Sequence, residues 1–273
     1  MKVLIFGSKG YMGGYFRRLY PEAVCPSVDI ADQKGVGDCL DTEKPDVVIN
    51  CAGKSGVPNV DWCEDHKMET IRSNVQGPLV LLEECAKRKI YWVHLSSGCI
   101  YEGDNDGRGF SEDDPPNFFG SFYSRTKGWA DQILKEFPVL QLRLRMPFDE
   151  THEVRNLIMK LKKYTKILDA ENSITHVPDM LSATSQLIEQ RATGIFNVVN
   201  PGTISPYHVM ELYKEIVDPA HTFERLSVES LSGVVKAGRS NCLLNTEKLA
   251  SVGIHMPPVE EAMRVALAEF AKG

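Results

Sequence analysis

The sequence lacks any long apolar run, and this excludes a membrane-spanning helix. Its longest strongly apolar stretches are VLIF, DVVI and PLVLL, whereas a bilayer-spanning helix needs about 20 apolar residues. Residues 2–6 run directly into a glycine turn, without an apolar leader region and a cleavage site, so we expect no signal peptide. Internal repeats and flexible linkers are missing too.

Paired cysteine and histidine spacings are also absent. The seven cysteines are spread singly without CxxC spacing, and an odd number is a poor disulfide framework. The seven histidines show no metal-ligand spacing. We therefore predict a cytoplasmic protein with reduced thiols and no metal site.

The chain has no basic stripe or tail. Its 31 Lys and Arg residues against 37 Asp and Glu residues give a net charge of −6. This argues against nucleic acid as the main partner, although a few placed donors can still hold a phosphorylated ligand. A length of 273 residues with 42% hydrophobic residues suits a globular protein with one large or two small domains.

Apolar strands alternate with amphipathic helical stretches in the first half of the chain. The expected strands are residues 2–6, 22–25, 46–50, 91–95 and 139–144. The expected helices are residues 11–20, 33–43, 61–89 with a break at Gly77-Pro78, and 118–137. This alternation predicts an α/β fold with a doubly wound parallel sheet of the Rossmann type.

The alternation of strands and helices becomes less regular after Met146-Pro147. Later helices are expected at residues 153–163, 178–191, 206–216 and 259–272, with a strand at 194–199. We predict a dinucleotide-binding Rossmann domain at 1–148 and a smaller C-terminal substrate-binding cap at 149–273. Roughly 176–204 should return to the sheet.

A GxxGxxG turn follows the first strand and opens the first helix. Glycines let the backbone approach a pyrophosphate closely, and the helix N-terminus offers free N–H groups and a positive dipole end. The turn predicts a dinucleotide cofactor, with a glycine-rich turn that binds nothing as the alternative. The predicted contacts in the turn are Gly7, Lys9, Gly10, Tyr11, Met12 and Gly13.

The choice between NAD and NADP stays open. The adenine ribose is usually read just after the second strand, and residues 25–32 hold no Arg or Lys for a 2′-phosphate. Asp29 and Ile30 are expected to flank the adenine, and Lys9 is within possible reach of a 2′-phosphate. Further cofactor contacts are expected after the third strand and in the later helix: Cys51, Ala52, Gly53, Tyr123 and Lys127.

Three residues predict carbonyl reduction. Tyr123 and Lys127 are four residues apart, so they share one face of a helix. A Lys ammonium beside a phenol is expected to lower the pKa of the Tyr from about 10 toward working pH. Such a Tyr can donate a proton to a reduced carbonyl, and Ser97 at the end of a strand can hold the substrate oxygen. The alternative is that Tyr123 and Lys127 are an ordinary i,i+4 pair on a helix surface, without a catalytic role.

With Asn50-Cys51-Ala52-Gly53, these motifs resemble the extended short-chain dehydrogenases/reductases. More narrowly, the chain is similar to the dTDP-4-dehydrorhamnose reductase group, above all to plant-type bifunctional UDP-4-keto-6-deoxy-glucose 3,5-epimerase/4-reductases. The runs that carry the likeness are GVPNVDWCEDHKMETIRSNV (56–75), GCIYE (98–102), PNFFGSFYSRTK (116–127), LRLRMP (142–147), RNLIMKLKKY (155–164), GIFNVVNPG (194–202) and RSN (239–241).

The resemblance implies that NAD(P)H reduces a UDP- or dTDP-linked 4-keto-6-deoxy sugar to NDP-rhamnose. It also implies that Cys99 and Lys160 carry protons during 3,5-epimerisation, which needs an acid and a base on opposite faces of the ring. Without it, Cys99 would be read as inert core and Lys160 as a solvated side chain. The expected substrate contacts are Asn59, Asn117, Arg155, Asn156 and Arg239. A homodimer through the helix of the YxxxK motif is a further expectation.

Two other functions compete with this one. A simple 4-ketoreductase would keep Cys99 and Lys160 without using them. A non-catalytic, reductase-like regulatory subunit would bind cofactor only, but the intact Ser97, Tyr123 and Lys127 weigh against it. A 4,6-dehydratase is disfavoured because Gly98-Cys99 stands where that chemistry wants an Asp-Glu pair.

Overall fold

A five-stranded parallel sheet forms the centre of the computed structural model, which describes residues 1–231 and 236–273. The strands lie in the order β1 (Val3–Phe6), β2 (Val47–Asn50), β3 (Tyr91–Ser97), β4 (Leu140–Leu144) and β6 (Gly194–Asn197). All neighbouring strands are parallel. The predicted α/β fold with a doubly wound parallel sheet is confirmed.

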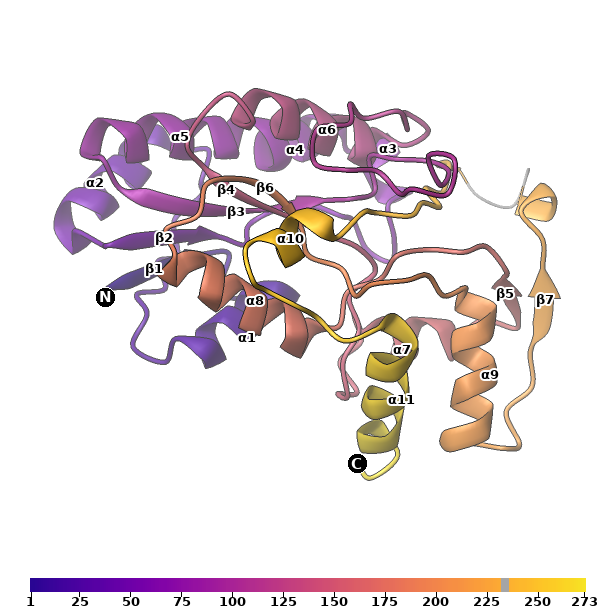
Figure 1. Ribbon diagram of the computed structural model, residues 1–273. Helices are drawn as coiled ribbons and strands as arrows, with labels where there is room; N and C mark the ends of the chain where they lie inside the picture. The colour runs from indigo at the N-terminus through magenta and orange to yellow at the C-terminus, as the bar shows by residue number, and fades with distance from the viewer. Residues whose placement is uncertain (232–235) are drawn as a thin grey trace.

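Helices cover both faces of this sheet (Figure 1). One face carries α1 (Tyr11–Leu19) and α8 (Val177–Glu189), and the other carries α2 (Gln33–Glu43), α5 (Gly77–Arg88) and α6 (Phe122–Leu134). Side chains alternate between the faces of a strand. In β1, Val3 and Ile5 therefore join the core under α1 and α8, while Leu4 and Phe6 join the core under the other helices.

The strand expected at residues 22–25 is wrong as a full strand. Only Val24 pairs with β1, through a parallel bridge to Leu4. Its N–H donates to the Val3 carbonyl at 2.9 Å, and its carbonyl accepts from the Ile5 N–H at 2.8 Å. Pro26 follows two residues later, and proline has no N–H to continue a strand ladder.

The helical stretch expected at 61–89 is broken at His66, whereas at Gly77-Pro78 the helix changes from π to α without the expected break. It consists of α3 (Trp62–Asp65), α4 (Lys67–Ile71), the π-helical segment η1 (Arg72–Gln76) and α5. Pro78 lies at the start of α5, directly after the π-helical segment, and the helix continues through it. Gly77 is needed at its position because an added Cβ would lie 2.4 Å from the Ile30 side chain.

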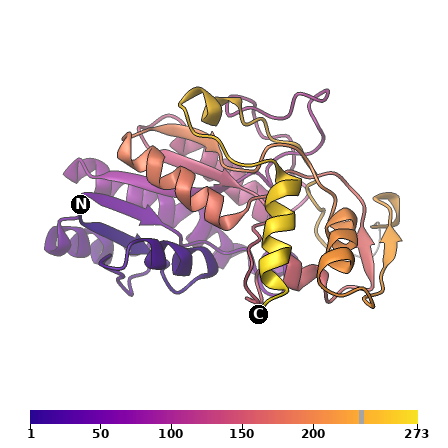
Figure 2. The same cartoon turned by 60° about the horizontal axis from the view of Figure 1, so that its bottom comes forward.

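The residues after β4 build a second hydrophobic core beside the sheet. It contains α7 (Leu157–Leu161), α9 (Pro206–Ile216) and α11 (Val259–Phe270), and Figure 2 shows α9 and α11 side by side. A two-stranded parallel sheet joins β5 (Lys166–Leu168) to β7 (Glu224–Leu226). Helix α10 (Glu247–Ser251) and the 3₁₀ turn η2 (Glu229–Leu231) complete the described elements.

Helix α7 is shorter than the expected 153–163. It starts after Asn156, whose side-chain oxygen caps the N–H of Ile158 at 3.1 Å. The predicted domain boundary at residue 148 stays a prediction. In the two described stretches of the chain, no helix is both long and apolar enough to cross a membrane.

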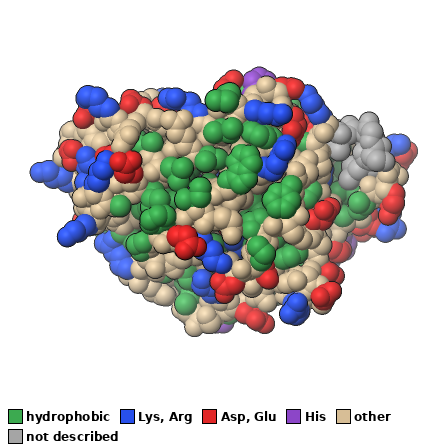
Figure 3. All heavy atoms as spheres, turned by 90° about the horizontal axis from the view of Figure 1, so that it is seen from above, with side chains coloured by type: hydrophobic (Ala, Val, Ile, Leu, Met, Phe, Trp, Pro, Cys, Tyr) green, Lys and Arg blue, Asp and Glu red, His purple; other side chains and the backbone are tan. Residues whose placement is uncertain are grey.

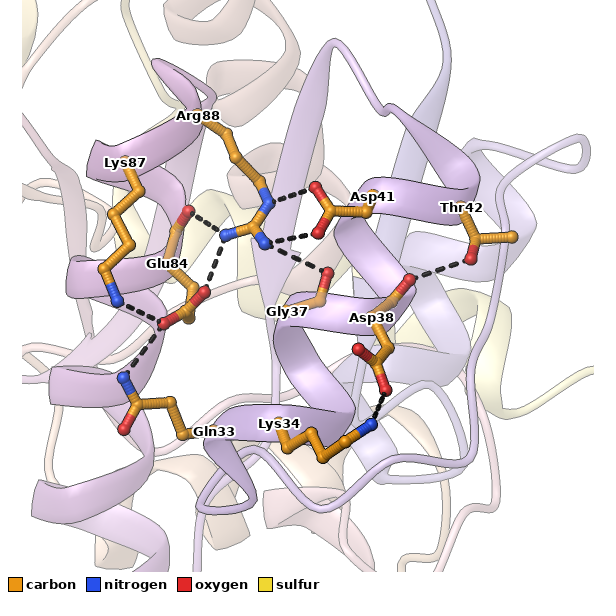
Figure 4. A network of polar contacts seen from close by, with 9 residues as sticks. All are labelled: Gln33, Lys34, Gly37, Asp38, Asp41, Thr42, Glu84, Lys87 and Arg88. Atoms are coloured by element: carbon orange, nitrogen blue, oxygen red, sulfur yellow. Dashed lines mark hydrogen bonds and ion pairs between the residues drawn. The ribbon is translucent and has the colours of Figure 1, made fainter.

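A polar network ties α2 to α5 at the rim of the sheet (Figure 4). Both oxygens of Asp41 accept hydrogen bonds of 2.7 Å from Arg88, which also donates to Glu84 at 2.6 Å. Glu84 is buried and accepts further bonds from Lys87 and Gln33. Hydrogen bonds from Lys87, Gln33 and Arg88 lower the pKa of Glu84 to about 2.

This pKa predicts a pH-dependent contribution to stability. A carboxylate whose pKa is lowered on folding stabilises the native state above its unfolded pKa, and this is lost as the pH falls toward the folded pKa. Glu84→Gln should therefore lower the free energy of unfolding at pH 7 by about 1–3 kcal/mol. Urea unfolding should show this difference shrinking between pH 4.5 and pH 2. A difference that is constant over that range would contradict the assignment.

Candidate active site

The glycine turn is pressed against the loop that follows β2. Gly7 has a φ of +74°, and an added Cβ would lie 2.5 Å from the Ala52 nitrogen. A Cβ on Gly13 would lie 2.1 Å from the Gly7 carbonyl oxygen. Gly10 is the N-cap of α1 and offers no side chain to cap its first N–H groups. These N–H groups fit a pyrophosphate, as the sequence predicts.

The loop after β2 is held from beneath by Asn50. The Asn50 side-chain oxygen accepts the Ala52 N–H at 3.0 Å, and its amide nitrogen lies 3.1 Å from Nδ1 of the buried His94. Burial lowers the pKa of His94, so the ring stays neutral. The predicted contacts Cys51, Ala52 and Gly53 therefore lie beside the turn on a fixed support. Sequence reasoning missed His94, because a single His in a strand belongs to no motif.

The predicted adenine side carries an exposed ion pair. Arg72 in η1 lies 3.0 Å from Asp29. A hydrogen bond from the Ala31 N–H, with the bonds from Arg72, lowers the pKa of Asp29. Ile30 is buried against Gly77. Lys9 is exposed, and the part of the chain that the structure describes gives it no ion-pair partner.

Ser97, Tyr123 and Lys127 come together where β3 ends beneath α6. Lys127 is buried, and its ammonium donates to the Leu95 carbonyl at 2.9 Å. An added Cβ on Gly53 would lie 3.6 Å from this ammonium, so Lys127 also faces the loop after β2. Burial lowers the pKa of Lys127 to about 8. The Ser97 hydroxyl lies close enough to the Tyr123 phenol to favour its ionised form.

The expected lowering of the Tyr123 pKa is wrong for this structure. Burial raises the pKa of Tyr123, and a negative charge on the nearby Cys99 would add to the rise. The nearby Ser97 hydroxyl and the charge of Arg145 oppose this rise without cancelling it. The phenol is thus a protonated donor at neutral pH, which is the form that reduction of a carbonyl requires.

Cys99 lies near these residues and near Lys160. Its N–H donates to the Ser97 hydroxyl at 3.1 Å. A charge on Cys99 would raise the pKa of Tyr123, Lys127 and Lys160, so the thiol is within electrostatic reach of all three. Lys160 on α7 is exposed, yet partial desolvation of its ammonium and the charge of Arg155 lower its pKa.

Arg145 organises the backbone around Cys99, and sequence reasoning missed it. This buried guanidinium donates to the Gly98 carbonyl at 3.2 Å and to the Ser240 hydroxyl at 2.7 Å. It also donates to the Ser173 carbonyl at 3.3 Å. The available signal was the second Arg of LRLRMP, which follows a buried strand at the edge where ligands bind.

The predicted substrate residues differ in how free their side chains are. Arg155 is exposed. Arg239 is held by Asp61, with Nη1 2.8 Å and Nη2 3.2 Å from the two carboxylate oxygens. Asn117 is exposed but pairs with the backbone of Glu102 through bonds of 2.8 and 3.0 Å.

Asn59 is partly exposed in the loop after β2, and its side-chain oxygen accepts the Asp61 N–H at 2.8 Å. Asn156 is different, because it is fully buried. Its amide nitrogen donates to Asp149 and to the Thr151 carbonyl, and its oxygen caps α7. In this structure Asn156 has no free polar atom for a substrate, so the expected contact is corrected to a structural one.

Comparison with known proteins identifies the family to which the chain belongs. A family model described as "RmlD substrate binding domain" matches residues 1–272. A bifunctional dTDP-4-dehydrorhamnose 3,5-epimerase/dTDP-4-dehydrorhamnose reductase of Arabidopsis thaliana is 36% identical, over 95% of this chain and 90% of its own length. A trifunctional UDP-glucose 4,6-dehydratase/UDP-4-keto-6-deoxy-D-glucose 3,5-epimerase/UDP-4-keto-L-rhamnose-reductase of the same plant is 37% identical, but the chain spans only 41% of it.

Solved structures agree with the fold. The crystal structure of the L780 UDP-rhamnose synthase of Acanthamoeba polyphaga mimivirus superposes with a TM-score of 0.94 at 35% identity, covering 98% of this chain and 99% of that one. A dTDP-4-dehydrorhamnose reductase of Bacillus anthracis in complex with NADP has a TM-score of 0.82 at 20% identity, with 98% and 99% covered. The second likeness concerns the fold alone.

Two adjacent glycines test the geometry of the turn. Gly13→Ala should distort it, because the new Cβ meets the Gly7 carbonyl, whereas nothing lies within 4 Å of a Cβ on Gly14. We expect Gly13→Ala to weaken binding of a nicotinamide dinucleotide at least tenfold. Gly14→Ala should bind normally and be more stable by up to about 1 kcal/mol. Titration calorimetry and thermal unfolding measure both, and equal affinities would refute this account of the turn.

Proposed function

Because the chain belongs to the RmlD substrate binding domain family, we propose that it is an NAD(P)H-dependent reductase of a nucleotide-linked 4-keto-6-deoxy sugar, which also performs the 3,5-epimerisation and so yields NDP-rhamnose. The observation that carries the proposal is the position of Cys99. It adjoins Ser97 and lies within electrostatic reach of both Tyr123 and Lys160. The names of the relatives support the reductase activity and the rhamnose product.

In the reduction, Ser97 and Tyr123 act on the C4 carbonyl oxygen. A nicotinamide dinucleotide held at the glycine turn would supply the hydride for C4. Tyr123 gives its phenolic proton to the oxygen, and Ser97 holds that oxygen by a hydrogen bond. Lys127 lies four residues along the same helix, and its positive charge favours the phenolate that remains. The raised pKa of Tyr123 keeps its phenol protonated before the reaction.

In the epimerisation, Cys99 and Lys160 act on C3 and C5. The C4 ketone acidifies the neighbouring C–H bonds, so a base can remove a proton from one face and an acid can return one to the other. Because the pKa of Lys160 is lowered toward neutral pH, its side chain can take up and release protons more readily there. We propose that Cys99 and Lys160 lie on opposite faces of the sugar.

The rest of the substrate is proposed to lie against the residues after 148, which form the substrate-binding cap. Arg155 is exposed, and a guanidinium suits bidentate contact with phosphate, so we propose that Arg155 contacts the diphosphate. Asn59 and the Arg239–Asp61 pair would border the sugar from the loop after β2. The exposed Lys9 in the turn is the group that would favour NADPH over NADH.

We also propose that a second copy of the chain covers α6. Figure 3 looks down on this face and shows hydrophobic side chains gathered at its centre. Phe119, Trp129, Ile133 and Phe137 are 39% to 60% exposed. Isolated apolar side chains are normal on a surface, whereas a contiguous patch marks an interaction site. Light scattering of concentrated protein tests this, and a strict monomer would contradict it.

Replacing the proposed acid should stop reduction without removing the cofactor site. Tyr123→Phe deletes only the phenolic oxygen, so turnover should fall by about 10²–10⁴-fold. Affinity for NADPH, followed by titration calorimetry, should stay within about twofold of the wild type. Near-normal turnover would mean that another residue supplies the proton or that the reaction is not carbonyl reduction.

A second prediction separates epimerase/reductase from simple reductase. Incubation of the UDP- and dTDP-linked 4-keto-6-deoxy-glucose in D₂O without reduced cofactor should place deuterium at C3 and C5. Cys99→Ser should slow this exchange by at least about 10²-fold, because a hydroxyl is a far weaker acid than a thiol with a reference pKa near 8.5. Lys160→Met should act similarly.

Both variants should still reduce a substrate whose C3 and C5 are already inverted, since Ser97 and Tyr123 are unchanged. Wild-type protein that incorporates no deuterium would leave the simple reductase as the function. Full exchange in Cys99→Ser would assign the proton to another residue, with the buried Cys63 as the first to test.

A further inference from the structure

Asp149 is a buried carboxylate held by neutral donors alone. It is fully inaccessible to solvent, and within the described ranges no Lys, Arg or His forms an ion pair with it. Five donors surround it, which satisfies its acceptor capacity without a cation. An arrangement of this kind is demanding to build, because a buried charge needs every hydrogen bond it can make.

The two oxygens of Asp149 face different parts of the molecule. Oδ2 accepts from the hydroxyls of Tyr11, at 2.8 Å, and Tyr15, both on the helix that opens at the glycine turn. Burial and Asp149 itself raise the pKa of Tyr15 to about 12, so its phenol remains a donor at neutral pH. Oδ1 accepts from the Thr151 N–H at 2.7 Å, the Thr151 hydroxyl at 2.6 Å and the Asn156 amide at 2.9 Å.

From Oδ1 the chain of contacts leads directly to Lys160. The side chain of Asn156 caps α7, and its backbone carbonyl accepts the N–H of Lys160 at 3.1 Å. Two hydrogen bonds therefore separate the Asp149 carboxylate from the backbone of Lys160. On the other side, hydrogen bonds from Tyr11 and Tyr15 join the same carboxylate to α1.

We propose that Asp149, with Tyr15 and Thr151, is a positioning site that fixes Lys160 relative to the glycine turn. This rests on the proposed epimerase function, in which Lys160 must meet one face of a sugar whose C4 is held near the cofactor. A carboxylate bridging α1 and α7 sets that distance. The reduction does not need the bridge, because Ser97 and Tyr123 are placed by β3 and α6 instead.

Tyr15→Phe tests the bridge, since it removes one donor from Oδ2 and leaves the contacts of Asn156 intact. We expect deuterium exchange at C3 and C5 to fall about tenfold in kcat, with KM within twofold. Reduction of a substrate already inverted at C3 and C5 should stay within twofold of the wild type. Thr151→Val, which removes a donor from Oδ1, should give the same division if Tyr15→Phe folds poorly.

Tyr20→Phe is the matched control. This tyrosine also belongs to the α1 region, but its hydroxyl lies 3.4 Å from Ser185 on α8 and contacts nothing on the route to α7. It should alter neither reaction. A general loss of stability would instead lower exchange and reduction together, which thermal unfolding of all three variants would reveal.

The outcomes separate the inference from the function on which it rests. If Lys160→Met abolishes exchange but Tyr15→Phe and Thr151→Val leave it at the wild-type rate, the positioning role of Asp149 is wrong and the epimerase function stands. Equal losses of exchange and reduction would also overturn the positioning role. If Lys160→Met exchanges normally, the epimerase role of Lys160 fails and the inference fails with it.

Discussion

A buried ion pair between Arg143 on β4 and Asp131 on α6 fixes the helix on which the proposed chemistry depends. The guanidinium makes bonds of 2.7 and 2.9 Å to the two carboxylate oxygens, and neither side chain is exposed. Ser96 on β3 adds a bond of 3.0 Å to the same carboxylate. Removing one partner of such a pair would leave an unpaired buried charge, a cost of about 3–5 kcal/mol.

The position of Asp131 in the helix explains why this matters. It follows Lys127 by four residues and Tyr123 by eight, so all three project from one face of α6. The ion pair thus presses that face onto β3 and β4, and Ser97 at the end of β3 meets Tyr123. Asp131 also partly offsets the lowering of the Lys127 pKa by burial. Helix docking and the charge of Lys127 therefore depend on one carboxylate.

The sequence predicted the features that are determined by short stretches of chain. The glycine turn, the YxxxK helix and the alternating strands each depend on residues within a dozen positions of one another, so spacing alone indicates them. The strand at 22–25 failed because a local apolar run does not reveal that only Val24 finds a partner. Asn156 failed because its type suits both a ligand contact and a helix cap, and only burial decides between them.

Contacts between distant residues were beyond sequence reasoning. Arg145 bonds to Ser240 across 95 positions, and Asp61 binds Arg239 across 178. Together with the bridge between Gly103 and Cys242, they bring the 236–245 segment against the loops on both sides of the site. No periodicity predicts such pairings, because they arise when separate loops meet at the same edge of the sheet. The site is therefore local in its chemistry and long-range in its construction.

The electrostatics of Cys99 suggest how one site could serve two reactions under the proposed function. A thiolate at Cys99 raises the pKa of Tyr123, so the base form needed for epimerisation keeps the reducing acid protonated. The same thiolate raises the pKa of Lys160 and so favours the ammonium, its proton-donating form. A negative charge on Cys99 thus favours the protonated forms of both Tyr123 and Lys160. Since epimerisation returns every proton that it removes, it leaves Tyr123 loaded for reduction, which alone consumes a proton.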